Sequence, residues 1–223
     1  MSIDPSSIIY FQYGFIKITA TLVFAWVTMA VLIGLCLIGT KGLKTGKTFS
    51  VGQNAVEFFM VAMENQVKGI AEKDYQRIIP FVGTLFLFIF VSNVMSVIPG
   101  YTPPTASLNT TIALAACVFF AVPAYGIAGK GIGGYLKQYI KPSPLMLPFN
   151  IIGEISRTIS LAVRLYGNVM SLTIIVAILL GVIPLFFPLV IQLLGIVTGV
   201  IQAYIFAVLA TVYIAAAVTK EGG

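Results

Sequence analysis

The residues best suited to chemistry are five polar side chains spread along one apolar stretch, residues 147–181. They are Glu154, Arg157, Arg164, Asn168 and Ser171. In an α-helix, which turns about 100° per residue, the five fall within an arc of about 100° and form one polar stripe. Placing a charge at the middle of an apolar membrane helix costs about 3 kcal/mol on insertion scales. The stripe therefore indicates a place where ions are handled.

Arg164 is the most informative of the five, because it lies well inside the apolar run, between Ser160–Val163 and Leu165–Gly167. Arginine stays charged because its pKa exceeds about 12, so the side chain must face water, a carboxylate, or both. The one acid within the predicted spans is Glu154, about 15 Å away along the helix at 1.5 Å per residue. We expect the partner on another chain. The alternative is that Arg164 caps main-chain carbonyls of a neighbouring helix.

Glu154 and Arg157 lie nearer the start of the same segment. Their spacing of three residues lets the two side chains pair on one face of a helix. Two interpretations stay open. The pair either anchors the helix at the membrane interface or takes a direct part in ion handling.

A second polar lining is predicted on the last apolar stretch. Gln202 sits in its middle and Tyr213 lies near its end. Gly195 and Gly199 form a GxxxG spacing, which lets another helix approach closely. These glycines and Gln202 share one side of the helix, so we expect a helix pair that places Gln202 beside Arg164.

The amino-acid composition indicates whether the segments that carry these residues lie in water or in a membrane. Of the 223 residues, 59% are hydrophobic and 9% are charged, and the mean hydropathy is +1.03. Soluble domains average about 25% charged residues, so this chain is predicted to be an integral membrane protein. The net charge of +6 resides in the connections rather than on one basic face, which argues against nucleic-acid binding.

Metal, cofactor and enzyme chemistry have little support in the sequence. The chain has no histidine, and Cys36 and Cys117 both lie in apolar segments, where free cysteine behaves as a small hydrophobe. There is no CxxC pair and no nucleophile–base constellation. We predict no metal site, no cofactor and no self-contained active site.

The expected fold is all-α, a single membrane domain with five spanning helices. A spanning helix needs about 20 apolar residues. The predicted spans are residues 15–39, 78–98, 109–129, 147–181 and 189–219. The last two exceed a perpendicular crossing, so they are predicted to be tilted, kinked or partly interfacial. Residues 51–72 mix apolar and charged side chains and are predicted to form an interfacial amphipathic helix, the alternative being a loop with a helical turn.

Lysine and arginine set the orientation. They concentrate in the connections 40–77 and 130–141, whereas 1–14, 99–108 and 182–188 have none. Basic loops stay in the cytoplasm, so the N-terminus is predicted outside and the C-terminus in the cytoplasm. The first span is interpreted as a retained helix rather than a signal peptide, although removal of a short leader stays open.

Three segments of the sequence resemble a known family, subunit a of the F-type ATP synthase. They are SLAVRLYGN at 160–168, PGYTPPTASLNTTIALA at 99–115 and QAYIFAVLATVY at 202–213. The order of the spans matches as well, and the resemblance covers nearly the whole chain.

The resemblance implies a stationary partner of a rotating c-ring in an energy-transducing membrane, such as a bacterial plasma membrane, with peripheral-stalk b subunits. Arg164 would face the ring carboxylate between two aqueous half-channels that carry H⁺ or Na⁺, and ring rotation would drive ATP synthesis elsewhere in the complex. The candidate channel-lining residues are Asn168, Gln202, Ser171, Thr173, Tyr213, Asn93, Ser96 and Asn109. For Asn93, Ser96 and Asn109, hydrogen bonding within their own helix is an equally open alternative.

The sequence departs from the family in one respect. Several members carry an acidic residue and a histidine on the last two helices, where this chain has Thr173 and Gly195. The outer half-channel is then expected to work through water and neutral polar groups, or the ion is Na⁺. Two other functions are alternatives: a stand-alone secondary transporter with Arg164 as its anion-binding residue, and a structural scaffold.

Overall fold

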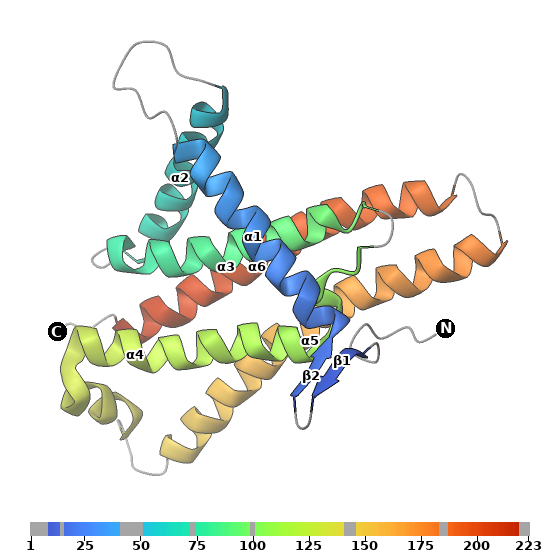
Figure 1. Cartoon of the computed structure of the whole chain (residues 1–223). Coiled ribbons are helices and arrows are strands. Elements are labelled where there is room, and N and C mark those ends of the chain that lie inside the picture. Colours follow the sequence, from blue (N-terminus) through green and yellow to red (C-terminus); the bar gives the residue numbers. More distant parts are fainter. Residues whose placement is uncertain are drawn as a thin grey trace.

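The computed structural model describes residues 9–13, 16–40, 51–71, 75–98, 101–140, 146–182 and 187–218, and nearly all of them are helical (Figure 1). The elements of the helical part are α1 (Ala20–Thr40), α2 (Val51–Ile70), α3 (Tyr75–Met95), the 3₁₀ helix η2 (Pro104–Ala106), α4 (Leu108–Ile140), α5 (Met146–Val182) and α6 (Phe187–Val218). Within the described ranges, α1, α3, α4, α5 and α6 are long and apolar enough to cross a membrane. The predicted all-α membrane class is confirmed.

A short antiparallel hairpin precedes α1, and the sequence prediction missed it. Its strands are β1 (Ile9–Tyr13) and β2 (Ile16–Thr19). The predicted helix 15–39 therefore begins too early, since α1 starts at Ala20. β1 (IYFQY) is rich in aromatic residues and β2 (IKIT) in β-branched ones, and both kinds favour extended backbone. Figure 1 shows the hairpin extending from the first turn of α1.

The other helix bounds differ from the predicted ranges mainly at helix ends. The predicted 78–98 is α3 at 75–95, followed by a turn at 96–98, and the predicted 51–72 is α2 at 51–70. The largest difference is α4, which continues beyond 129 to Ile140 across a kink at Gly131. The φ of Gly131 is 75°, a left-handed conformation that glycine adopts without a steric penalty.

Beyond that kink, the chain folds back onto the preceding helix. The buried ring of Tyr135 packs against the backbone at Gly126, where a Cβ atom would lie 2.6 Å from the ring. Only glycine at position 126 permits this contact. Figure 1 shows the bend at the end of α4 next to the start of α5.

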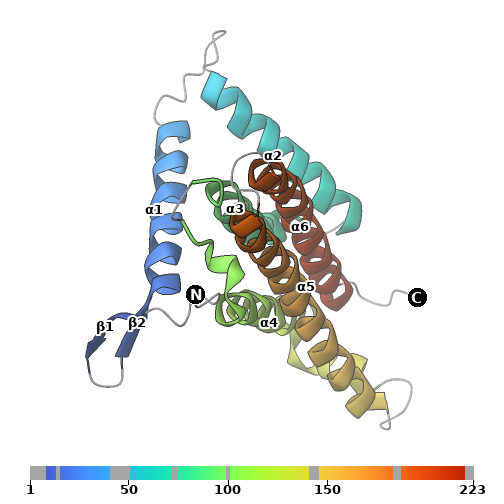
Figure 2. The ribbon, with the colours of Figure 1, turned by 90° about the vertical axis from the view of Figure 1, so that its right-hand side faces the viewer.

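Both of the last two helices are long, with 37 residues in α5 and 32 in α6. The kinked helix α4 has 33 residues. At 1.5 Å per residue α5 and α6 measure about 55 and 48 Å, against a hydrocarbon core of about 30 Å. They run antiparallel and side by side in both views (Figures 1 and 2). Their tilt in the bilayer stays a prediction, and these lengths favour it.

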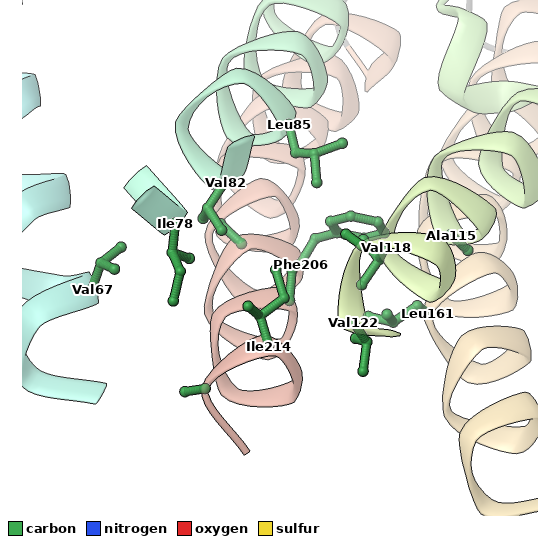
Figure 3. Close-up of a cluster of buried hydrophobic side chains, with 14 of the residues drawn as sticks. Val67, Ile78, Val82, Leu85, Ala115, Val118, Val122, Leu161, Phe206 and Ile214 are labelled. Carbon is green, nitrogen blue, oxygen red and sulfur yellow. The ribbon is translucent and has the colours of Figure 1, made fainter. Parts of the chain in front are cut away.

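The hydrophobic core surrounds α6, which packs against α3, α4 and α5. Figure 3 shows Phe206 and Ile214 of α6 between Ile78 and Val82 of α3 on one side and Val118 of α4 on the other. Small residues on α6 let these neighbours approach closely; buried examples are Ala203, Ala207 and Ala210.

The predicted range 51–72 is helical, and one face of α2 packs into the protein. Met63 and Val67 are buried in the same core, whereas Glu57 and Glu64 are exposed, as is the apolar Phe58. Its placement at the membrane interface stays a prediction.

Candidate functional site

Arg164 lies midway along α5 with an exposed side chain. The adjacent Leu161, Ala162 and Leu165 are buried, so one face of this turn is packed into the protein. The turn therefore presents its guanidinium away from the core. Within α5 and α6 as described, Glu154 is the one carboxylate, and it lies ten residues away, about 15 Å along the helix.

The exposed surface around Arg164 mixes polar and apolar side chains. On the arc of α5 that Arg164 occupies, Arg157, Ser160 and Ser171 are exposed within two turns, and Ile175 and Ile178 are exposed further along. The neighbouring helix α6 carries its own exposed apolar stripe at helical spacing, made of Leu193, Val197, Ile201 and Tyr204. An arginine exposed midway along an apolar membrane helix is suited to a partner that carries a compensating negative charge.

Contacts along the α5–α6 pair define its register. The Asn168 side chain donates a hydrogen bond to the main-chain carbonyl of Thr198 at 3.3 Å, and the guanidinium of Arg157 lies over the ring of Tyr213, 5.6 Å from its centroid. In this antiparallel register, positions 202–203 of α6 lie opposite Arg164.

Gln202 is therefore level with Arg164, but the two side chains occupy different faces rather than lying side by side as predicted. Gln202 is 6% exposed, whereas Arg164 is exposed. The Nε2 atom of Gln202 is buried and has no hydrogen-bond partner among the described residues. Buried polar atoms nearly always have partners, and this nitrogen is a hydrogen-bond donor, so the amide is a candidate to donate to water.

A buried polar cluster lies where α3, η2 and α6 meet. Asn93 donates a hydrogen bond from Nδ2 to the Gly199 carbonyl at 3.0 Å and accepts one at Oδ1 from Thr105 at 3.1 Å. The hydroxyls of Ser92 and Thr105 are 3.4 Å apart. All four residues are buried. Asn93 is thus hydrogen-bonded between elements, not only within its own helix.

A second polar contact ties the segment before η2 to α1. The Tyr101 and Thr28 hydroxyls are 2.6 Å apart, and the Tyr101 ring meets Phe24 edge to face. Burial raises the pKa of Tyr101 above 10.0, although hydrogen bonds to Thr28 and Ser92 act in the opposite direction. The Tyr101 phenol is therefore a neutral group at physiological pH.

Further buried hydroxyls in this part of the protein have no partner among the described residues. They are Thr21, Thr102 and Ser107. Together with the Gln202 amide they make a set of unsatisfied polar atoms on α1, α6 and the segment around η2. Polar sites of this kind usually hold ordered water.

Of the remaining predicted lining residues, three donate hydrogen bonds to main-chain carbonyls three or four residues earlier, and one is exposed. Ser96 donates to the carbonyl of Asn93 at 2.6 Å, Ser171 to that of Gly167 at 2.6 Å, and Thr173 to that of Val169 at 3.0 Å. Asn109 is exposed at the start of α4. For Ser96, the geometry favours the local hydrogen bond that was left open as an alternative.

The two glycines of the GxxxG spacing face different helices. A Cβ on Gly199 would lie 2.9 Å from the Cβ of Asn93 on α3, whereas one on Gly195 would lie 3.4 Å from Leu172 on α5. Close packing thus requires glycine at position 199, while position 195 has ordinary contact distances. The predicted ion pair of Glu154 with Arg157 stays a prediction; the contact of Arg157 with Tyr213 was not foreseen.

Sequence reasoning also missed Ser92, Thr105, Thr28, Tyr101 and Ser107. A signal was present, because the string PGYTPPTAS at 99–107 gathers hydroxyl residues between two apolar spans. Their partners on α1, α3 and α6 could not be read from the string.

Comparison with known proteins gives a consistent result. The family model described as the ATP synthase A chain matches residues 22–215. ATP synthase subunit a 2 of Acaryochloris marina is 54% identical over 217 residues, 97% of this chain and 93% of the relative. ATP synthase subunit a of Albidiferax ferrireducens is 53% identical, covering 97% and 94%, and subunit a 2 of a Picosynechococcus strain is 51% identical, covering 99% and 95%.

Proposed function

Because this chain belongs to the ATP synthase A chain family, and thus takes part in ion translocation by the membrane sector of an ATP synthase, we propose that it is the stationary subunit that offers two half-channels to a ring of c subunits. Flow of H⁺ or Na⁺ through them turns the ring, and rotation drives ATP synthesis elsewhere in the complex. The chain itself needs no active site for this role.

The observation that carries the proposal is the exposure of Arg164 midway along a long apolar helix. The ring docks on the outward face of α5 and α6, around Val163, Ile175 and Val197. An ionised ring carboxylate at the level of Arg164 supplies the counter-charge that these two helices do not place there, since their one carboxylate, Glu154, is ten residues away. A positive charge and a carboxylate a few ångströms apart attract strongly where water is scarce.

Arg164 then separates the two half-channels. Its fixed charge favours the empty, ionised carboxylate, so a loaded carboxylate gives up its ion as it approaches. An ion cannot pass directly from one half-channel to the other, because the guanidinium repels it between them. Each charge that crosses gains about 2.3 kcal/mol per 100 mV of membrane potential, which drives the rotation.

The outer half-channel is lined by neutral polar groups. The unsatisfied Gln202 amide and the Ser107 hydroxyl mark its inner part, and the predicted lining residues Asn168 and Asn109 flank it. Water held by these groups takes over the task of the acidic residue and histidine that Thr173 and Gly195 replace. In this arrangement the choice between H⁺ and Na⁺ belongs mainly to the ring carboxylate.

The chain lies in an energy-transducing membrane such as a bacterial plasma membrane, and the lysine-rich and arginine-rich connections support an orientation with the N-terminus outside and the C-terminus in the cytoplasm. The half of α5 that begins at Met146, after the lysine-bearing connection, lies on the cytoplasmic side. Peripheral-stalk b subunits hold the chain against the torque of the ring.

Site-directed crosslinking tests the docking face. In a background with Cys36 and Cys117 replaced by serine, Ser160→Cys on the exposed face of α5 carries a photoactivatable crosslinker. We expect crosslinks to the ring subunit from this position and none from the control Ile33→Cys, which is 60% exposed on α1. Crosslinks from position 33 alone would refute the assigned face. Purification without any ring subunit would instead favour the stand-alone transporter.

A further inference from the structure

We infer that Arg157, held over the ring of Tyr213, is a second fixed cation on the ring-facing surface and weakens the ion affinity of the ring carboxylate on the release side. This inference rests on the proposed function. It assigns a role in release to a residue for which the sequence left only anchoring or an unspecified direct role open.

The geometry of Arg157 supports this placement. Arg157 and Arg164 are seven residues apart, which is about 20° around the helix and about 10 Å along it. Both side chains are exposed. Whatever docks against Arg164 therefore also meets Arg157, two turns nearer the cytoplasmic end of α5.

Tyr213 restrains the guanidinium. Its ring centroid lies 5.6 Å from the Cζ atom of Arg157, within the range of a cation–π contact. Tyr213 is half-buried on α6, so the ring is a firm platform. An arginine that would otherwise sample many rotamers is thereby held at the α5–α6 seam.

Among the described side chains of α5 and of the elements that pack against it, Arg157 is the cation nearest to the ring-facing surface on the cytoplasmic side of Arg164. On its own helix, Glu154 lies one turn earlier and about 60° round the helix from it. The helix α6 has no Asp, Glu, Lys or Arg between 187 and 218 and offers Tyr204 and Tyr213. On α4, Lys130 is the charged residue among those whose side chains are described, and η2 has none.

A fixed positive charge about 10 Å from a carboxylate favours its ionised form. At the effective dielectric constant of about 20 that suits protein sites, the interaction changes ion affinity by up to about tenfold, equivalent to one pH unit for H⁺. The sign is definite: removal of the charge makes the carboxylate hold its ion more tightly. A lower concentration of the ion on the cytoplasmic side, where ATP is made, is then enough to reload the carboxylate and oppose synthesis.

The test uses the complete ATP synthase in vesicles at a fixed membrane potential, normalised to the amount of assembled complex. The coupling ion, H⁺ or Na⁺, is raised on the ATP side until synthesis falls to half. In Arg157→Gln we expect this concentration to fall up to about tenfold. Arg157→Lys keeps the charge and should stay within about twofold of the unmodified complex.

Two variants of the platform extend the test. Tyr213→Phe keeps the aromatic face and should keep the half-inhibition concentration of the unmodified complex, whatever its rate of synthesis. Tyr213→Leu frees the guanidinium and should shift that concentration in the same direction as Arg157→Gln, but less. If Arg157→Gln does not assemble, the contrast between these two variants decides the question. If Arg157→Gln reduces the amount of assembled complex but the complex that does assemble has an unshifted half-inhibition concentration, the inference is overturned in favour of an anchoring role.

Arg164→Ala in the same series separates a failure of the Arg157 inference from a failure of the proposed function. Loss of coupled synthesis in Arg164→Ala, with Arg157→Gln unshifted, overturns the Arg157 inference alone. Retention of coupled synthesis in Arg164→Ala overturns the proposed function and this inference with it.

Discussion

Gly199 of α6 and Asn93 of α3 approach so closely that a Cβ atom on Gly199 would lie 2.9 Å from the Cβ of Asn93. The same Asn93 side chain donates a hydrogen bond to the Gly199 carbonyl at 3.0 Å. Steric fit and polar pairing thus coincide at one crossing point, one turn before Gln202. The position of α6 relative to α3 depends on this contact.

Gly199→Ala should disrupt that crossing. An added methyl group in a packed site typically costs 1–3 kcal/mol because side chains and backbone must shift. We expect a lower thermal inactivation temperature of the assembled complex. Gly195→Ala is the matched control, since its nearest neighbour would be Leu172 at an ordinary 3.4 Å. Equal loss of stability in both variants would argue against the special closeness of Gly199.

Thr105→Val should weaken the buried polar cluster. It removes the hydroxyl that donates to Asn93 Oδ1 and leaves that buried oxygen unsatisfied, at a cost of about 1–3 kcal/mol. Thr105→Ser keeps the donor and should retain most of the stability. Heat inactivation of the complex measures both, and a Thr105→Val variant as stable as Thr105→Ser would contradict the hydrogen-bond assignment.

Asn168→Leu should loosen the α5–α6 pair near Arg164, because it removes the hydrogen bond to the Thr198 carbonyl. We expect a stability loss of about 1 kcal/mol and a measurable ion leak, followed by a pH- or Na⁺-sensitive dye in vesicles. Thr173→Val is the control, as its hydroxyl bonds within α5 to Val169. A tight membrane with Asn168→Leu would indicate that this bond does not support the separation of the half-channels.

Tyr101 predicts an alkaline limit to stability. Burial raises its pKa above 10.0 in the folded chain, so the unfolded chain loses this proton first as the pH rises. The contribution of Tyr101 is complete below pH 10 and is lost as the pH rises through its folded pKa. Tyr101→Phe should therefore lose less thermal stability than the unmodified chain when the pH is raised above 10. Parallel pH profiles for the two proteins would contradict the shift.

The sequence predicted the membrane helices well because the signal is compositional. A run of about 20 apolar residues is sufficient to indicate a span, and the described part of the chain contains five such helices. Helix ends were less predictable. The strands β1 and β2 lie directly before an apolar helix, and at positions 16–19 the apolar run masked the β-branched pattern. The extension of α4 depends on a positive φ at Gly131, which residue order alone does not reveal.

The site was predictable where the reason for a residue lies in its own segment. Arg164 stands out because a charge in an apolar helix is costly. Contacts between distant segments were not predictable. Arg157 and Tyr213 are 56 positions apart, and Asn93 meets Gly199 across 106. Gln202 was expected beside Arg164, but it is level with Arg164 on a buried face, because which side of α6 is buried depends on α3 and α4.

Replacement of Arg164 by alanine, with ATP synthesis and ion flux measured together in the reconstituted complex, tests the central claim most directly. The account predicts an assembled complex that no longer couples ion flow to synthesis, and Gly195→Ala, on the neighbouring helix, should couple normally. Near-normal coupling in Arg164→Ala would contradict the role of this arginine in separating the half-channels.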